Sequence, residues 1–274
     1  MESSPLSATF KRLRAEKRAA FIPFFAAGDP DLKTSGELIV SAAAAGADII
    51  EVGVPFSDPI ADGPVIQASY YRALEKGFRI ADLLQTISEL RKNGLSVPLV
   101  CMISYTLVFK QSPAKFFRAC KQAGFDGMII PDLPAGYEGD AAERAAETGL
   151  DLIFLIAPTT TPERREMIAR RSRGFIYYMS VTGITGARTV LPPDLEANIN
   201  DIKNRTHLPV CVGFGISQPE QAAAVSAIAD GVIVGSALVK TLEDGLSRGC
   251  SGTALIESVS ARVAQLAEAC HGVK

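Results

Sequence analysis

Residues 45–53 read AGADIIEVG, and this stretch decides the fold class because the end of a helix and a buried strand meet within it. Glycine closes a helix in the left-handed conformation, and the apolar run after the aspartate suits a strand buried on both faces of a parallel sheet. The phrase recurs as AGFDGMII over 123–130, as TGLDLI over 148–153 and, more weakly, as IADGVIV over 228–234. The chain therefore alternates helices with buried parallel strands.

Helix starts and strand positions extend this alternation along the chain. Ser112 and Thr161 each stand before a first-turn proline as capping hydroxyls, and Ser217 lies three residues before Glu220, the spacing of a capping box. Eight strands are predicted, each followed by a helical pattern, near residues 20–25, 48–53, 97–103, 126–131, 151–156, 174–179, 208–213 and 230–235.

Eight strand–helix units without an obvious linker close most economically into a (βα)₈ TIM barrel of the α/β class, a single domain over residues 1–274. A doubly wound open sheet is the alternative. Within residues 1–18, Phe10 and Leu13 lie one helical turn apart among basic residues. This spacing predicts an extra amphipathic N-terminal helix that packs on the barrel.

The composition excludes several classes of function. The formal net charge is -2, so no general basic field recruits nucleic acid or an acidic membrane, and an anionic ligand needs a local site. No apolar run reaches the length of a membrane span. The cysteines are odd in number and lack a CxxC pair, which indicates a reducing cytoplasm and favours neither a disulfide framework nor a metal site.

Two long loops are expected to carry the chemistry, because βα loops build the active sites of such barrels. They cover residues 54–67 and 180–193. Just before the first loop, Glu51 is an acid in an apolar strand without a basic neighbour, so burial is expected to raise its pKa toward that of a general acid or base. The alternatives are a Glu51 satisfied by backbone donors or a distant arginine, and, for Asp58 and Asp62 in the loop, ordinary turn residues.

Small residues after the last strands predict a phosphate site. They let backbone N–H groups approach an anion, and the loops after the seventh and eighth barrel strands, with a helix N-terminus, form the recurrent phosphate site of this fold. The predicted phosphate-binding residues are Gly186, Gly213, Gly215, Gly235 and Ser236.

The sequence resembles the tryptophan synthase alpha chain family over essentially its whole length. EVGVPFSDPIADGPVIQ over 51–67 is similar to the family's signature almost residue for residue, and shorter matches follow in the family's order: GDP at 28–30, PDLP at 131–134, GITGA at 183–187 and GFGIS at 213–217. The resemblance implies a lyase of tryptophan biosynthesis that splits indole-3-glycerol phosphate into indole and glyceraldehyde 3-phosphate.

The same resemblance implies roles for individual residues. Glu51 is similar to the family's catalytic acid/base, and Asp62 to the carboxylate that receives the indole N–H and stabilises positive charge on the protonated ring. Thr185 matches a loop threonine that reaches Asp62 when the loop closes. Tyr177 matches a tyrosine that lines the site, although a ring that only fills the barrel mouth is the alternative. The indole slot would be formed by Phe24, Ile66, Ile129 and Phe214.

A partner also follows from the resemblance. It implies a pyridoxal-phosphate β subunit in an αββα heterotetramer, with no metal or organic cofactor on this chain. One loop departs from the family, because MISYTL over 102–107 stands where the family usually has Met-x-Tyr-x-Asn-Pro, facing that subunit. The expected interface residues are Pro55, Asp58, Ser104 and Thr106.

Three other functions stay open at this point. The chain could be a catalytically weak barrel kept as an allosteric activator of the β subunit, although intact Glu51, Asp62 and Thr185 argue against this. It could also be a stand-alone lyase that releases indole, or another phosphosugar enzyme of the same barrel class.

Overall fold

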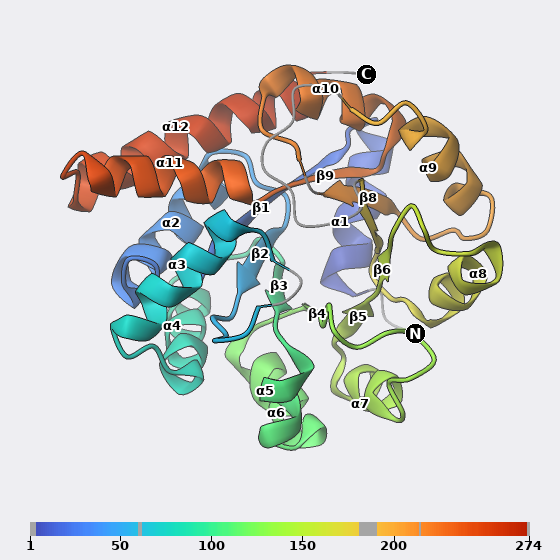
Figure 1. Ribbon diagram of the computed structural model, residues 1–274, viewed down its shortest axis with the longest axis horizontal. Helices are drawn as coiled ribbons and strands as arrows, with labels where there is room; N and C mark the ends of the chain where they lie inside the picture. The colour runs from blue at the N-terminus through green and yellow to red at the C-terminus, as the bar shows by residue number, and fades with distance from the viewer. Residues whose placement is uncertain (1–3, 60–61, 181–190, 214, 273–274) are drawn as a thin grey trace.

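The computed structural model describes residues 4–59, 62–180, 191–213 and 215–272. Figure 1 looks down a ring of strands surrounded by helices. The strand pairs are all parallel, in the order β5-β4-β3-β2-β1-β9-β8-β7-β6. The strands are β1 (Ala20–Ala26), β2 (Ile50–Gly53), β3 (Leu99–Met102), β4 (Gly127–Ile129), β5 (Asp151–Ile153), β6 (Leu155–Ile156), β7 (Ile176–Met179), β8 (Val210–Gly213) and β9 (Gly231–Val234).

The two ends of this order, β5 and β6, are neighbours in the chain and are separated only by Phe154. β5 pairs with β4 and β6 pairs with β7, so the strand predicted over 151–156 is one strand in two pieces that brings the sheet back on itself. Ile153 and Leu155 face the barrel interior while Phe154 faces the helices, so the alternation continues through the break. The predicted (βα)₈ barrel is confirmed, and the alternative of an open doubly wound sheet is wrong.

Helices form the outer layer of the barrel (Figure 1). Gly124 and Gly149 end two of them in the left-handed conformation, as the recurring phrase indicates. The helices are α1 (Pro5–Ala15), α2 (Leu32–Ala44), α3 (Pro64–Glu75), α4 (Ile80–Lys92), α5 (Tyr105–Lys110), α6 (Pro113–Ala123), α7 (Ala141–Thr148), α8 (Pro162–Arg171), α9 (Leu195–Lys203), α10 (Pro219–Ile228), α11 (Ser236–Ser247) and α12 (Gly252–His271).

Two of the three predicted helix caps differ in the structure. Thr161 caps α8 as expected, since its hydroxyl accepts from the N–H of Arg164. Ser112 has a φ of 67° and makes no capping hydrogen bond with its side chain. The capping box of α10 lies one residue later than predicted: the N–H of Gln218 donates to Oε1 of Gln221, because the helix begins at Pro219.

Alternation along the strands divides the core into two layers. On β1, Ile22 and Phe24 point into the barrel, whereas Phe21 and Phe25 point outward beneath the helices. Inward side chains of this kind fill the interior of small barrels. The barrel is therefore a packed core, and space for a ligand is left only where this filling stops.

The extra N-terminal helix predicted within residues 1–18 is α1. Its apolar side chains Leu6, Phe10 and Leu13 are buried and join the interior layer of the barrel. The ring of Phe10 lies 5.8 Å from that of Phe175, just before β7, so α1 covers the end of the barrel where the strands begin.

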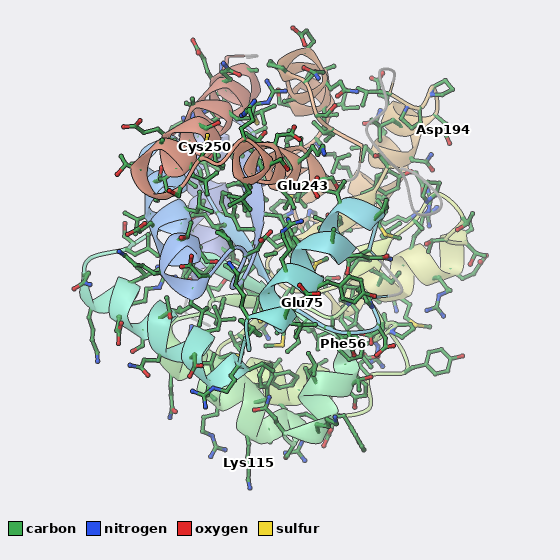
Figure 2. The ribbon with its side chains drawn as sticks, turned by 60° about the vertical axis from the view of Figure 1, so that its left-hand side comes forward. Phe56, Glu75, Lys115, Asp194, Glu243 and Cys250 are labelled. Carbon is green, nitrogen blue, oxygen red and sulfur yellow. The ribbon has the colours of Figure 1, made fainter. Side chains whose placement is uncertain are left out.

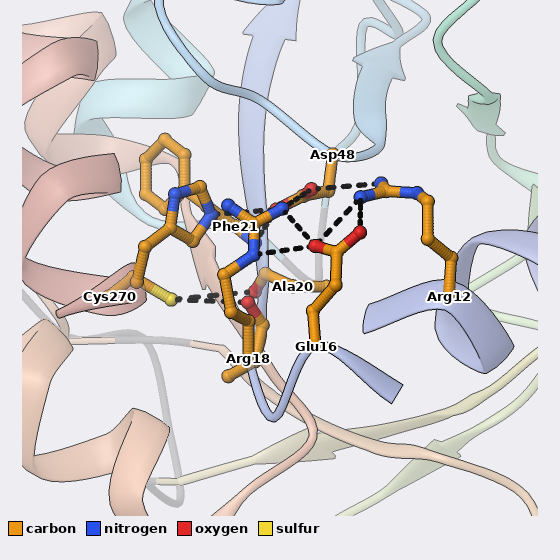
Figure 3. Close-up of polar contacts among 9 residues, drawn as sticks. Arg12, Glu16, Arg18, Ala20, Phe21, Asp48 and Cys270 are labelled. Atoms are coloured by element: carbon orange, nitrogen blue, oxygen red, sulfur yellow. Dashed lines mark hydrogen bonds and ion pairs between the residues drawn. The ribbon is translucent and has the colours of Figure 1, made fainter. Parts of the chain in front are cut away.

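Polar contacts hold α1, β1 and α12 together at this end of the barrel (Figure 3). The carboxylate of Asp48 accepts from the N–H of Phe21 at 3.0 Å and lies 2.8 Å from Nε2 of His271 at the end of α12. Arg12 of α1 and Arg18 lie 3.4 and 3.6 Å from the same carboxylate. One buried acid thus links α1, β1 and α12 at this end of the barrel.

Candidate active site

A cavity of about 320 Å³, here called the central cavity, opens where the strands end. Its walls come from the end of β2 and the loop after it, from β7, from the loops after β8 and β9, and from α11 and α12. This is the face at which (βα)₈ barrels carry their active sites. The volume lies within the range of about 300–1,000 Å³ that is usual for small-molecule pockets.

Glu51 reaches the central cavity from the interior face of β2, beside Phe24 on β1. Only 1% of the residue is exposed, and among the described residues neither carboxyl oxygen has a hydrogen-bond partner. Burial and, secondarily, the charge of Asp62 raise the pKa of Glu51 from its ordinary 4.5 to about 8. The shift has the direction that the sequence indicates, and Glu51 is mainly protonated at neutral pH.

Asp62 faces the same cavity from the loop between β2 and α3. Its N–H donates to the carbonyl of Pro59 at 3.2 Å, and the side-chain amide of Gln67 donates to the carbonyl of Asp62 at 2.8 Å. Burial raises the pKa of Asp62 to about 6. At pH 7 the cavity therefore holds a protonated Glu51 and an ionised Asp62. The difference between the two pKa values makes Glu51 the proton donor and Asp62 the anion.

Apolar side chains line the cavity beside the two acids. Phe24, Ile66 and Tyr177, all singled out from the sequence, are among them. Ile129 is fully buried in the barrel interior and does not line the cavity. Phe214 lies outside the described residues.

The part of the cavity wall formed by the loops after β8 and β9 has the features of an anion site. Gly215 lines it with a φ of 79°, and Gly235 and Ser236 line it at the N-terminus of α11. The first N–H groups of a helix lack intrahelical partners and favour negative charge.

Three residues of the sequence-based site are not placed at this wall. Gly213 does not line the cavity: a Cβ there would lie 2.4 Å from Oη of Tyr177, so the glycine makes room for that ring. Thr185 and Gly186 lie outside the described residues.

The structure adds residues that the sequence did not reveal. Tyr70 is fully buried, and its hydroxyl interacts electrostatically with both acids; burial, then the charges of Asp62 and Glu51, raises its pKa well above 10. Its spacing of four from Ile66 on α3 was the available signal. Lys240 on α11 and Arg262 on α12 line the cavity near the anion wall, and no motif marks either of them.

The expected partner-facing residues lie on neighbouring loops at the same end. Asp58 is exposed, and Pro55 is buried, so the proline offers little surface for docking. Ser104 is half-buried: its hydroxyl caps α5 and donates to Asp132 at 2.7 Å. Thr106 is exposed on α5.

Neither a metal cluster nor a membrane helix is found in the described part of the chain. Within those ranges, no group of three or more His, Cys, Asp or Glu side chains is arranged to hold a metal ion. Also within them, no helix combines the length and apolar character needed to cross a bilayer.

Comparison with known proteins identifies the family. The family model of the tryptophan synthase alpha chain matches residues 10–271. The tryptophan synthase alpha chain of Rhodopirellula baltica is 44% identical over 274 residues, which cover 99% of this chain and 98% of that protein. The protein of the same name from Synechocystis is 47% identical over 241 residues, covering 88% and 91%.

Solved structures agree with the sequence relatives. Tryptophan synthase subunit alpha from Legionella pneumophila superposes with a TM-score of 0.89 at 31% identity, covering 97% of this chain and 98% of the other. A chain of Mycobacterium tuberculosis tryptophan synthase gives a TM-score of 0.89 at 36% identity, covering 98% and 99%.

The chain therefore belongs to the tryptophan synthase alpha chain family. Its role is that of an alpha subunit, a lyase in tryptophan biosynthesis. These matches do not favour the open alternatives, which were a catalytically weak activator of the β subunit, a stand-alone lyase and another phosphosugar enzyme.

Proposed function

We propose that this chain cleaves indole-3-glycerol phosphate into indole and glyceraldehyde 3-phosphate by acid/base catalysis, with Glu51 as the proton-transfer residue. The observation that carries the proposal is the pair of acids on one cavity: a fully buried, protonated Glu51 without a described partner, and a carboxylate at Asp62. A polar group left unpaired in a dry site is costly, and a reacting group of the substrate would supply the missing hydrogen bond to Glu51.

The chemistry divides between the two acids. Cleavage requires a proton on the ring carbon that carries the side chain, and the protonated Glu51 can supply it. Positive charge then develops on the indole nitrogen, and the carboxylate of Asp62 stabilises this charge by accepting a hydrogen bond from the indole N–H. The carboxylate of Glu51, left after the first transfer, takes the proton of the side-chain hydroxyl as the aldehyde forms, and the electron pair of the broken carbon–carbon bond returns to the ring. One proton is delivered and one is removed, so the step is balanced.

The walls of the central cavity suit the two ends of this substrate. Phe24 and Ile66 offer apolar surface for the flat indole ring near Asp62. Gly215, Gly235 and Ser236 also line the cavity, and backbone N–H groups there can hold the phosphate. We infer that Tyr177 lines the site between them, and that Thr185, Gly186 and Phe214 complete it.

We further propose that the chain works in the cytoplasm, bound to a pyridoxal-phosphate β subunit in an αββα heterotetramer, without a metal or organic cofactor of its own. Large apolar side chains are exposed near Asp58 and Thr106: Tyr71 is 48% exposed on α3, and Phe109 is 69% exposed on α5. Exposed aromatic residues of this kind are enriched in protein interfaces. The free cysteines, Cys101, Cys120, Cys211, Cys250 and Cys270, suit a reducing compartment.

Indole release with and without the β subunit tests the function. We expect the isolated chain to form indole and glyceraldehyde 3-phosphate in equal amounts, and the β subunit to raise the rate. Stimulation of the β subunit by a chain that releases no indole would support the activator instead. An equal rate with and without the β subunit would support the stand-alone lyase.

A further inference from the structure

Arg262 enters the central cavity from an unexpected element. It lies on α12, the last helix, which packs against α10 and α11, and it lines the cavity together with Gly215, Gly235 and Ser236. Glu51, which is buried and has no hydrogen-bond partner among the described residues, faces the same cavity, as expected of a space that a ligand occupies. Arg262 thus shares a wall with the backbone groups expected to hold the phosphate.

The guanidinium of Arg262 is fixed by neutral oxygen atoms. Nη2 donates to the carbonyl of Ser217 and, at 3.2 Å, to Oε1 of Gln218, and Nη1 donates to Oε1 of Gln265 at 3.1 Å. Ser217 and Gln218 belong to the turn that follows Gly215 and begins α10. Arg262 therefore ties this turn to α12 and limits the orientations that the guanidinium can adopt.

The charge of Arg262 is not balanced by any carboxylate within hydrogen-bond or salt-bridge distance in the described ranges, in contrast to its neighbour. Lys240, which also lines the cavity, lies 2.8 Å from Glu243 and 3.1 Å from Asp244. Glu243 is also paired with Arg72 of α3 at 3.2 Å, and Figure 2 labels it between α11 and α3. Lys240 is thus neutralised, whereas Arg262 adds net positive charge to the wall.

We propose that Arg262 is a further substrate-recognition residue, which supplies positive charge for the phosphate of the ligand and holds the turn at Gly215 in its binding position. The inference rests on the proposed function and deepens it, because it makes the cavity selective for a doubly charged phosphate over a neutral analogue. A fixed guanidinium suits phosphate oxygens, and a charged hydrogen bond is about twice as strong as a neutral one.

The test compares Arg262→Gln, Arg262→Lys and a control. Arg248→Gln is the matched control, because Arg248 is an exposed arginine at the far end of α11 that does not line the cavity. Calorimetric titration gives the dissociation constants of inorganic phosphate and of uncharged indole, and steady-state kinetics gives kcat and KM for indole-3-glycerol phosphate. Thermal unfolding confirms that each variant is folded.

We expect Arg262→Gln to weaken phosphate binding and to raise KM by about tenfold, with a much smaller change in kcat and in indole affinity. Arg262→Lys should recover part of the loss, and Arg248→Gln should resemble the wild type. Unchanged phosphate affinity in Arg262→Gln would overturn the inference, as would an equal loss for indole or a lysine variant as weak as the glutamine variant. Wild-type protein that binds phosphate through Arg262 but cleaves no substrate would refute the proposed function alone.

Discussion

Replacing Glu51 by glutamine should remove activity and stabilise the protein at alkaline pH. The folded protein holds the Glu51 proton more tightly than the unfolded chain does, since the pKa rises from 4.5 to about 8. The contribution of Glu51 to stability is therefore greatest below pH 4.5 and declines as the pH rises toward 8. At about 1.4 kcal/mol per pKa unit, ionising Glu51 costs at most about 5 kcal/mol, and entry of water reduces this to about 2–4 kcal/mol.

The neutral amide keeps the shape of the carboxylic acid and has no such cost. We expect Glu51→Gln to unfold with a free energy close to that of the wild type at pH 5, and about 2–4 kcal/mol higher at pH 9. Its rate of indole formation should fall by about 10²–10⁴, because the amide cannot transfer the proton. Urea denaturation at pH 5, 7 and 9, with indole formation at pH 7, measures both effects.

The control is Glu75→Gln on α3, an exposed residue that is labelled in Figure 2. It should change neither the pH dependence of stability nor the rate. If the stability difference between Glu51→Gln and the wild type is the same at pH 5 and pH 9, the buried acid does not have the raised pKa on which the mechanism depends. Near-normal turnover of Glu51→Gln would remove Glu51 from the reaction altogether.

The remaining predictions concern the rest of the site. Asp62→Asn should lower kcat by about 10²–10³. It should also move the limb of the pH–rate profile assigned to Glu51 to lower pH, because the charge of Asp62 raises the pKa of Glu51. A limb that stays in place would show that the two acids are not coupled. Gly215→Val should raise KM by about tenfold or more, since the φ of 79° at Gly215 disfavours a side chain and we propose that backbone N–H groups there hold the phosphate. An unchanged KM would place the anion elsewhere. The double variant Ser104→Tyr/Thr106→Asn should bind a β subunit with the family's usual surface several-fold more tightly than the wild type does and its own β subunit less well, which titration of both pairs measures; equal affinities in all pairings would show that this loop does not control docking.

Much of the fold was predictable because local sequence patterns determine its strands and helix ends. Buried strands of a parallel sheet are continuous apolar runs, and αL glycines such as Gly124 and Gly149 end the helices between them. The break of one strand at Phe154 was not predictable, because the apolar run continues through it and the geometry of barrel closure interrupts the pairing. The positive φ at Ser112 likewise follows from how α5 turns into α6 and not from the residue type.

The site divides in the same way. Glu51 was found from the sequence because an acid in a buried strand contradicts its surroundings, and the contradiction is visible locally. Arg262 and Lys240 reach the cavity from α12 and α11, where their residue type and spacing are those of any exposed helical cation. Only the packing of these helices against each other and against β1 brings the two side chains to the cavity, so no local pattern could identify them.

Two glycines at strand ends explain why the surroundings of Glu51 are dry enough to shift its pKa. A Cβ on Gly53, the last residue of β2, would lie 2.4 Å from Cζ of Phe24 and 2.5 Å from the hydroxyl of Tyr70. A Cβ on Gly213 would lie equally close to the hydroxyl of Tyr177. These glycines therefore act through close approach: each lets an aromatic ring lie against the backbone, and the rings take the place of water beside Glu51. Since burial is the largest cause of the raised pKa, the glycines of these two motifs would support the proposed proton transfer by admitting the rings, in addition to any contact with phosphate.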